Sequence, residues 1–459
     1  MPNVADIVDE KRIEALLKTA GHPSREQAEA ILEEALRMRG LRPEQVAALL
    51  SIEDPNMLER LFETAWRIKR AIYGERLVFF APLYLSSYCV NDCEYCGFHC
   101  RNPVPRRKLT MEELAQQTTI LIDMGHKRLL LEFGEHPEVN PIDYVVECIR
   151  TIYATKSGKG EIRRVNVNIA ATTVEDYRKI KAAGIGTYQL FQETYHRETY
   201  AALHRGPKAD YERQLFAHDR AFAGGIDDLG LGVLFGLYDY RFEVLALLAH
   251  AQYLDGTYGV GPHTFSVPRF QPADTVQFDM PYRVSEQEIL RIIAILRVSI
   301  PYTGMIISTR ERPEIRAKAF TIGISQTSAA SRTSPGAYGD GGEELEQFTI
   351  ADHRSLDDVV LGTLRQGLLP SFCTACYRQG RTGEVFMKLA KPGAIHHLCR
   401  PNGILTFKEY LEDYASDAVK REGEKVIRAY LAEIASAGRR AETVRRLVRI
   451  EKGERDLYF

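Results

Sequence analysis

Three closely spaced cysteines indicate a metallocentre. Cys89, Cys93 and Cys96 lie in an eight-residue run shortly after the apolar stretch Leu77–Tyr84. Three thiolates can bind three irons of a cubane iron-sulfur cluster, which leaves the fourth iron without a protein ligand. A metal with an open coordination position can bind a substrate, whereas a site closed by four protein ligands is usually structural. The spacing therefore predicts a catalytic cluster.

A zinc site is the alternative for this run, with His99 or Cys100 as the fourth ligand. Structural zinc sites usually combine one close cysteine pair with a second, distant pair, and this pattern does not fit the run. A second group of cysteines follows far downstream and also has three members, which are Cys373, Cys376 and Cys399. Each group therefore predicts a cluster with an open iron.

The composition is that of an ordinary globular protein: 459 residues, 45% of them hydrophobic and 27% charged, with a net charge of -2. The near-neutral balance gives no reason to expect nucleic acid or an anionic membrane as a partner. The first residues lack the features of a signal peptide, and no apolar run is long enough to span a bilayer. We therefore expect a cytoplasmic protein.

In that compartment, eight cysteines are better explained by metal binding or catalysis than by disulfides. Two of the eight fall outside both groups. Cys148 lies in a helical pattern and is predicted to be a core thiol, and we also assign Cys100 to packing.

The order of predicted elements indicates an α/β fold. Residues 1–75 have the pattern of charged amphipathic helices, and Ser24 is a predicted helix cap. Strands then alternate with helices, which predicts a (β/α)8 TIM barrel over 76–345, followed by a mainly helical cluster-binding domain over 346–459. The eight predicted strands are Leu77–Leu83, Arg128–Phe133, Val165–Ile169, Thr187–Leu190, Gly230–Phe235, His263–Val267, Gly304–Ser308 and Phe320–Ser325.

Local signals support these boundaries. Thr110 and Ser285 begin capping-box patterns, and Gly125 and Gly184 stand where left-handed caps would end helices. The segment 328–342 is rich in glycine, serine and proline, so it is predicted to be either a linker or a loop that lines a site. Residues 424–449 have the pattern of an amphipathic helix.

The motifs resemble those of a known superfamily. Cys-x3-Cys-x2-Cys after the first barrel strand, with Tyr95 before the last cysteine, is similar to the motif of radical S-adenosylmethionine (SAM) enzymes. The downstream group, with 22 residues between its last two cysteines, resembles the tyrosine lyases that mature [FeFe]-hydrogenase; the tyrosine lyases of thiamine synthesis lack it. Three further stretches resemble the aromatic amino-acid lyase branch, namely Gln192–His196, Gly261–Arg269 and Ile306–Arg310.

The resemblance implies two [4Fe-4S] clusters, one of them carrying an additional iron, and SAM bound at the open iron of the first. It implies that Tyr95 seats the adenine, that Gly134 and Glu135 bind the methionine amino group, and that Glu193 and Arg213 contact the ribose and carboxylate ends. Reduction of SAM would generate a 5′-deoxyadenosyl radical, which needs a closed barrel interior because it is too reactive for water.

For an amino-acid substrate, a carboxylate in a desolvated pocket requires a guanidinium, whose planar fork makes two charge-assisted hydrogen bonds. We expect Arg310, after the seventh strand, to have this role. The alternative is a surface ion pair of Arg310 with Glu311 or Glu314.

The resemblance also implies a reaction. The Cα–Cβ bond of L-tyrosine would break to give p-cresol and dehydroglycine, and dehydroglycine would yield carbon monoxide and cyanide at the second cluster. His263 matches the position that holds an additional iron, and imidazole is a suitable iron ligand. An Fe(CO)(CN) unit for the hydrogenase H-cluster would then be assembled. The implied partners are ferredoxin or flavodoxin as electron donor and other hydrogenase maturation proteins.

Two other functions remain open at this point. The chain could be a tyrosine lyase that makes dehydroglycine for thiamine synthesis. It could instead be a redox or zinc protein whose two cysteine groups only bind metal.

Overall fold

Five helices precede the first strand. The computed structural model describes residues 3–280, 282–339 and 346–459. The N-terminal helical layer is confirmed, and Ser24 caps its third helix by accepting a hydrogen bond from the backbone of Gln27. Helix α5 buries an apolar face against α13 of the barrel. The helices are α1 Val4–Ile7, α2 Glu10–Thr19, α3 Arg25–Ala35, α4 Pro43–Leu50 and α5 Pro55–Tyr73.

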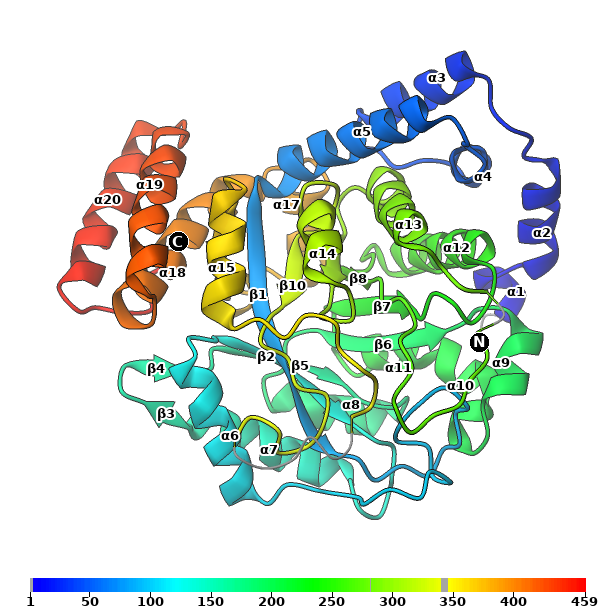
Figure 1. Cartoon of the computed structure of the whole chain (residues 1–459), viewed down its shortest axis with the longest axis horizontal. Helices are drawn as coiled ribbons and strands as arrows, with labels where there is room; N and C mark the ends of the chain where they lie inside the picture. Colours follow the sequence, from blue (N-terminus) through cyan, green and yellow to red (C-terminus); the bar gives the residue numbers. More distant parts are fainter. Residues whose placement is uncertain (1–2, 281, 340–345) are drawn as a thin grey trace.

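Eight parallel strands form a closed barrel, because the last strand pairs with the first as well as with its predecessor. The predicted barrel is therefore confirmed. In Figure 1, β1 runs from the end near α5 to the opposite end, where the first cysteine group follows it. The barrel strands are β1 Arg76–Ser86, β2 Arg128–Phe133, β5 Arg164–Asn168, β6 Tyr188–Glu193, β7 Leu229–Val233, β8 Thr264–Ser266, β9 Gly304–Ile307 and β10 Gln326–Ser328.

The eighth strand lies later in the chain than predicted. Phe320 is the last residue of helix α14, and the apolar residues after it pack behind the helix end, where the backbone of Ile322 and Ile324 bonds the carbonyl of Ala319. The strand itself is the buried polar segment Gln326–Ser328, in which Gln326 and Ser328 face the barrel interior and Thr327 faces Arg316 of α14. A short polar strand lacks the apolar pattern by which strands are recognised.

Helices cover the outside of the barrel, and the predicted caps are present. Thr110 and Ser285 form capping boxes with Glu113 and Glu288. Gly125 and Gly184 have φ values of +102° and +84° at helix ends. The covering elements are α6 Met111–Asp123, α7 Ile142–Ala154, α8 Val174–Ala182, α9 Arg197–Leu203, η1 Pro207–Ala209, α10 Tyr211–Leu215, α11 Ala217–Ala223, α12 Tyr240–Tyr258, α13 Glu286–Ser299 and α14 Pro313–Phe320; a small hairpin joins β3 Lys156–Ser157 to β4 Gly160–Glu161.

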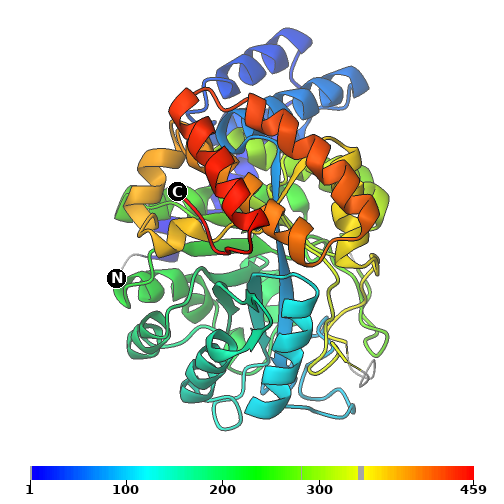
Figure 2. The same cartoon turned by 90° about the vertical axis from the view of Figure 1, so that its left-hand side faces the viewer.

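The C-terminal part packs at the end of the barrel opposite the first cysteine group (Figure 2). Its strand β11 pairs with β1 outside the barrel. The predicted single helix over 424–449 is wrong, because two helices meet there and Ser436 caps the second. The boundary between residues 345 and 346 remains a prediction. The elements are α15 Leu356–Arg365, β11 Leu369–Ser371, α16 Ala375–Arg378, α17 Gly383–Ala390, α18 His396–Asp413, α19 Asp417–Ala432 and α20 Ala437–Glu451.

Within the described residues, we find no helix whose length and apolar character would let it cross a membrane.

Candidate functional site

The first cysteine group lies in a loop directly after β1. Its three thiols line one cavity of about 120 Å³, which we call the cysteine-loop cavity. The loop follows the C-terminal end of a barrel strand, which is where TIM barrels place their chemistry. The guanidinium of Arg106 holds the loop in shape by donating hydrogen bonds to four of its carbonyls, those of Ser87, Phe98, His99 and Asn102.

Burial keeps these thiols neutral in the absence of a cation. It raises the pKa of Cys93 well above its usual value and that of Cys96 to about 11, with a further contribution from neighbouring Cys89 in the second case. Iron binds the thiolate form, so a bound cluster would favour deprotonation of these thiols. In the described ranges, no three His, Cys, Asp or Glu side chains are grouped closely enough to bind one metal ion. A cubane distributes its thiolates over three irons, so three thiols in one cavity fit it.

The two candidates for a fourth zinc ligand have other surroundings. The Nδ1 of His99 lies 2.8 Å from one carboxylate oxygen of Asp92, and Arg101 donates a hydrogen bond to the other oxygen. Cys100 is exposed, so its assignment to packing is wrong. It lies in the loop outside any element with a buried face, unlike Cys148, which is fully buried in α7 as predicted.

Gly134 and Glu135 attach the end of β2 to the cysteine loop. A Cβ on Gly134 would lie 2.3 Å from the carbonyl oxygen of Tyr88, so only glycine permits this contact. Gly134 therefore lets the end of β2 approach the backbone of the loop that carries the first cysteine group. Glu135 accepts one hydrogen bond from Asn91 and another from Arg213, both of 2.6 Å.

Arg213 is connected to the cysteine-loop cavity by its hydrogen bond to Glu135. It does not line the cysteine-loop cavity, although Glu135 does. Its Nη1 is buried without a hydrogen-bond partner in the structure, so one donor remains available. The direct contact to SAM that the resemblance implies for Arg213 remains a prediction.

Glu193 ends β6 in an unusual conformation. Its φ is +68°, which costs a residue with a side chain about 1–3 kcal/mol and is typical of functional sites. Its carboxylate accepts a 2.7 Å hydrogen bond from Lys208, which also lines the cysteine-loop cavity. Burial alone would lower the pKa of Lys208, but Glu193 and the thiol of Cys93 raise it overall. Lys208 was not predicted, because it lies in the short helical turn η1 without a recognisable motif.

Tyr95 lies where the cysteine-loop cavity meets the barrel interior. It is 7% exposed, and its hydroxyl lies 2.8 Å from Nε2 of His204. A second cavity of about 130 Å³, the barrel cavity, occupies the upper barrel interior. Tyr95, Cys96, Glu132 and Glu193 line both cavities, so the two are continuous.

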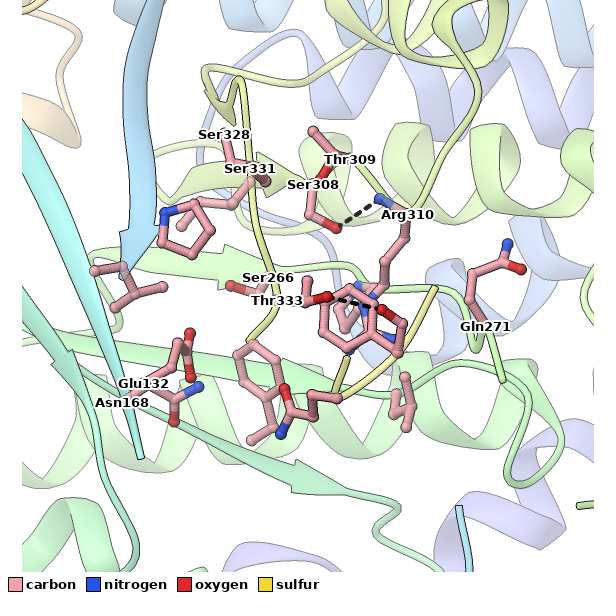
Figure 3. A pocket seen from close by; sticks show the side chains of 18 of the residues that line it. Glu132, Asn168, Ser266, Gln271, Ser308, Thr309, Arg310, Ser328, Ser331 and Thr333 are labelled. Carbon is pink, nitrogen blue, oxygen red and sulfur yellow. Dashed lines mark hydrogen bonds between the residues drawn. The ribbon is translucent and has the colours of Figure 1, made fainter. Parts of the chain in front are cut away.

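Arg310 lines the barrel cavity (Figure 3). The alternative of a surface ion pair is wrong, because Glu311 pairs with Arg269 at 2.6 Å, and no carboxylate of the described residues forms an ion pair with Arg310. The guanidinium carbon lies 3.2 Å from the ring centre of Phe348. Burial lowers the pKa of Arg310, because its positive charge is removed from water. An anionic ligand bound beside the guanidinium would stabilise this charge.

Glu132 is a second charged group of the barrel cavity, and it was not predicted. Figure 3 shows it beside Asn168, across the cavity from Arg310. Burial raises its pKa from an ordinary value of 4.5 to about 8, although Arg310 and Asn168 act in the opposite direction. An acid within an apolar strand gives no separate sequence signal. Together, Glu132 and Arg310 match the two charges of an amino-acid zwitterion.

The segment after β10 lines the site. Of its described part, Ser328, Ser331 and Thr333 border the barrel cavity, which favours the lining role over the linker; residues 340–342 lie outside the described residues. Gln347 and Phe348 also border this cavity, and Gln347 accepts a 2.8 Å hydrogen bond from Tyr84.

The second cysteine group lies at the other end of the barrel. Cys373 follows β11, Cys376 is in α16 and Cys399 is in α18, and all three line a cavity of about 50 Å³, the lower cavity. Burial raises the pKa of Cys376 to about 12, with Cys399 as the next cause. Three thiols in one cavity again fit a cubane cluster.

His263 lines the lower cavity together with these thiols. It directly precedes β8, so it lies at the N-terminal end of that strand. Its Nδ1 is 3.3 Å from a carboxylate oxygen of Asp228, and burial lowers its pKa. No hydrogen bond joins these two described side chains, but a neutral imidazole that turns Nδ1 toward a carboxylate presents its other nitrogen to a metal. Asp228 was not predicted.

The barrel and lower cavities are stacked inside the same barrel. Along β2, Arg128 faces the lower cavity, whereas Leu130 and Glu132 face the barrel cavity, as the two-residue period of a strand requires. A small apolar cluster of Phe80, Leu130 and Ile306 lies between the two cavities. A product released in the barrel cavity is therefore separated from the second cysteine group by one layer of side chains.

Two family models match the chain. Residues 83–251 match the radical SAM superfamily, and residues 266–368 match the Biotin and Thiamin Synthesis associated domain. A curated relative is 2-iminoacetate synthase of Escherichia coli (strain K12), which is 33% identical over 74% of this chain and 89% of its own length.

Two solved structures extend the similarity to the second cysteine group. One is a HydG described as a maturase of the [FeFe]-hydrogenase; it is 54% identical, has a TM-score of 0.96, and the match covers 99% of this chain and 100% of that one. The other is the FeFe-hydrogenase maturase HydG from Carboxydothermus hydrogenoformans, which is 37% identical with a TM-score of 0.86 over 97% of this chain and 100% of that one. The chain therefore belongs to the HydG family of [FeFe]-hydrogenase maturases within the radical SAM superfamily.

Proposed function

We propose that this radical SAM enzyme cleaves the Cα–Cβ bond of L-tyrosine into p-cresol and dehydroglycine. Dehydroglycine is then converted into carbon monoxide and cyanide at a second cluster, where an Fe(CO)(CN) unit is assembled for the [FeFe]-hydrogenase H-cluster. The observation that carries the proposal is that the barrel cavity, with Arg310 and Glu132 in its lining, lies inside one barrel between two groups of three thiols.

At the upper end, Cys89, Cys93 and Cys96 hold the first cluster, which with SAM supplies a 5′-deoxyadenosyl radical when both are bound. Tyr95 borders both cavities and is suited to seat the adenine at their junction. The remaining polar contacts of SAM are assigned to Gly134 and Glu135 after β2, Glu193 at the end of β6, Lys208 in η1 and Arg213 in α10.

In the barrel cavity, Arg310 binds the carboxylate of tyrosine and Glu132 binds its ammonium group. The two side chains approach from opposite walls, so they orient the Cα atom between them. The walls are mostly apolar, which suits a radical reaction from which water must be excluded.

At the lower end, Cys373, Cys376 and Cys399 hold the second cluster, and His263 binds the additional iron. The carboxylate of Asp228, 3.3 Å from Nδ1 of His263, would favour the orientation that leaves the other ring nitrogen for the iron. Dehydroglycine contains the atoms of one carbon monoxide, one hydrogen cyanide and one water, so its conversion needs no further atom. Reduced ferredoxin or flavodoxin supplies electrons, and other maturation proteins receive the iron unit.

The proposal predicts two sets of products. Reconstituted protein, given L-tyrosine, SAM and a low-potential reductant, is expected to form 5′-deoxyadenosine and p-cresol, followed by carbon monoxide and cyanide. Mass spectrometry detects p-cresol, and the carbon monoxide adduct of haemoglobin reports the gas. Release of an indole fragment from tryptophan in place of p-cresol from tyrosine would contradict the substrate assignment.

The same assay separates the other functions. A lyase that serves thiamine synthesis stops at dehydroglycine, which hydrolyses to glyoxylate and gives no carbon monoxide. Such an enzyme would have no use for the second cysteine group. A protein that only binds metal would form neither p-cresol nor 5′-deoxyadenosine.

The pKa of Glu132 predicts a pH-dependent affinity for tyrosine. In the free enzyme, Glu132 is protonated below about pH 8, and it must lose this proton to bind an ammonium group. Affinity should therefore rise with pH by up to about tenfold per unit below pH 8 and level off above it. Equilibrium binding of tyrosine from about pH 6.5 to about pH 8.5 measures this slope.

Glu132→Gln is expected to remove the slope and to weaken binding at the alkaline end. The same substitution at exposed Glu138 is the matched control and should leave the slope unchanged. A slope that persists in Glu132→Gln would show that another group carries the titration.

A further inference from the structure

The lower cavity has a strongly positive lining. Two guanidiniums, those of Arg76 and Arg128, border it together with His263 and the three thiols, and no described residue of its lining is an aspartate or glutamate. Buried arginines are usually paired with a carboxylate or another anion, because an unpaired buried charge is costly. Apart from the three thiols, the described lining therefore has no side chain that can balance these two charges.

Arg128 is held in place and still has free donors. It begins β2, is 6% exposed, and donates one hydrogen bond to the side chain of Gln326 at 3.0 Å and one to the carbonyl of Cys373 at 2.9 Å. Its Nε is buried without a partner. A guanidinium has five N–H groups, so these two bonds leave three donors. The two bonds orient the guanidinium next to the Cys373 backbone.

Arg76 lies on the neighbouring strand β1. It borders the same cavity, and its Nε is also buried without a hydrogen-bond partner. Its guanidinium contacts the thiol of Cys399. Arg76 therefore adjoins the cluster position, whereas Arg128 adjoins only the backbone of a ligand residue.

We propose that Arg128, assisted by Arg76, forms a carboxylate-binding subsite beside the second cluster. It would hold a small α-imino or α-oxo acid by its carboxylate, with the rest of the molecule at the open iron. Charge-assisted hydrogen bonds from a fixed guanidinium are the usual means of binding a carboxylate. That the natural ligand is dehydroglycine rests on the proposed function; the subsite itself rests on the cavity.

A purely electrostatic role is the competing explanation, in which the guanidiniums only neutralise thiolates. Arg164 provides the comparison that separates the two. It begins β5 in register with Arg128 and has a buried Nε without a partner. Its guanidinium carbon lies 3.1 Å from the ring centre of Tyr377, and that of Arg128 lies 5.6 Å from the same ring centre. Arg164 does not line the lower cavity. Arg164 thus supplies similar buried charge without access to the subsite.

The test uses glyoxylate, the stable oxo analogue of dehydroglycine, and its uncharged methyl ester. Calorimetry measures binding to the reconstituted full chain with both clusters loaded. Saturating tyrosine fills the barrel cavity, and SAM and reductant are left out so that no turnover occurs. Glyoxylate is expected to bind and the ester is expected to bind far more weakly, because only the acid carries a carboxylate.

Arg128→Gln is expected to weaken glyoxylate binding by about 10- to 150-fold, which corresponds to the loss of hydrogen bonds to a charged group. Arg128→Lys keeps the charge but loses the planar guanidinium that can make two hydrogen bonds to a carboxylate, so it should retain only part of the affinity for glyoxylate. Arg164→Gln should remain much closer to the wild-type chain. Iron content and melting temperature, measured for each variant, identify those that retain the fold and both clusters.

If Arg128→Gln and Arg164→Gln weaken glyoxylate binding equally, the proposed subsite is wrong and a general electrostatic role is supported. Equal affinity for glyoxylate and its methyl ester would also show that the subsite is wrong. These outcomes differ from a failure of the proposed function. If the wild-type chain makes carbon monoxide from tyrosine but Arg128 does not affect glyoxylate binding, only the subsite is wrong. If glyoxylate binding depends on Arg128 but tyrosine yields no carbon monoxide, the subsite stands and the proposed reaction is wrong.

Discussion

Cys93→Ser is expected to abolish all chemistry, including the cleavage of SAM. Cys93 is the most buried thiol of the cysteine-loop cavity, and a serine hydroxyl is a poor ligand for iron that prefers thiolate. Without the first cluster no electron reaches SAM, so 5′-deoxyadenosine, p-cresol and carbon monoxide should all fall to the level of protein without iron. Chromatography of the reaction mixture measures the three products together.

Cys100→Ser is the matched control for this prediction. Cys100 belongs to the same loop, but it is exposed, so the same change of sulfur to oxygen should leave the products unchanged. Formation of 5′-deoxyadenosine by Cys93→Ser at a rate comparable to that of Cys100→Ser would contradict the assignment of the first cluster.

Replacing Cys373 and Cys376 together by serine is expected to separate the two halves of the reaction. The barrel and lower cavities are distinct, and the layer of Phe80, Leu130 and Ile306 lies between them. p-Cresol should therefore still form from tyrosine, while carbon monoxide is lost. Dehydroglycine that is not converted should accumulate as glyoxylate. Iron bound per chain should fall by about half, since one of two four-iron clusters is missing.

Residual iron supports the interpretation of this double variant, because it shows that the first cluster is intact. If p-cresol and carbon monoxide decline by the same factor while that iron remains, the proposed division of labour between the two ends of the barrel is wrong.

Much of the fold could be predicted from local patterns. Capping boxes at Thr110 and Ser285 and glycines at 125 and 184 mark helix ends through bonds within a few residues. Buried parallel strands are recognisable because both of their faces are apolar. The same rule explains the error at the eighth strand, where apolar residues after α14 pack behind the helix and the polar segment Gln326–Ser328 forms the strand.

The candidate site was predictable where its residues form a compact motif, and not elsewhere. Cys89, Cys93 and Cys96 are close in the chain, so their spacing alone indicates a shared metal. Lys208 and Glu132 had no such signal, because the properties of each depend on surroundings that only folding creates. Lys208 meets Glu193 across the cysteine-loop cavity, and the pKa of Glu132 is raised by burial, which is a property of the folded barrel.

The sequence by itself determined that two groups of three thiols exist, that a barrel follows a helical layer, and that the first group follows a strand end, because all of these depend on short spacings and local periodicity. Only the tertiary structure decided that the second group lies at the opposite end of the same barrel. There it brings Cys373, Cys376 and Cys399 into one cavity with His263 and Arg128, which come from distant segments. Closure of the barrel between β10 and β1 creates this cavity, and contacts between segments so far apart depend on the packing of the whole chain.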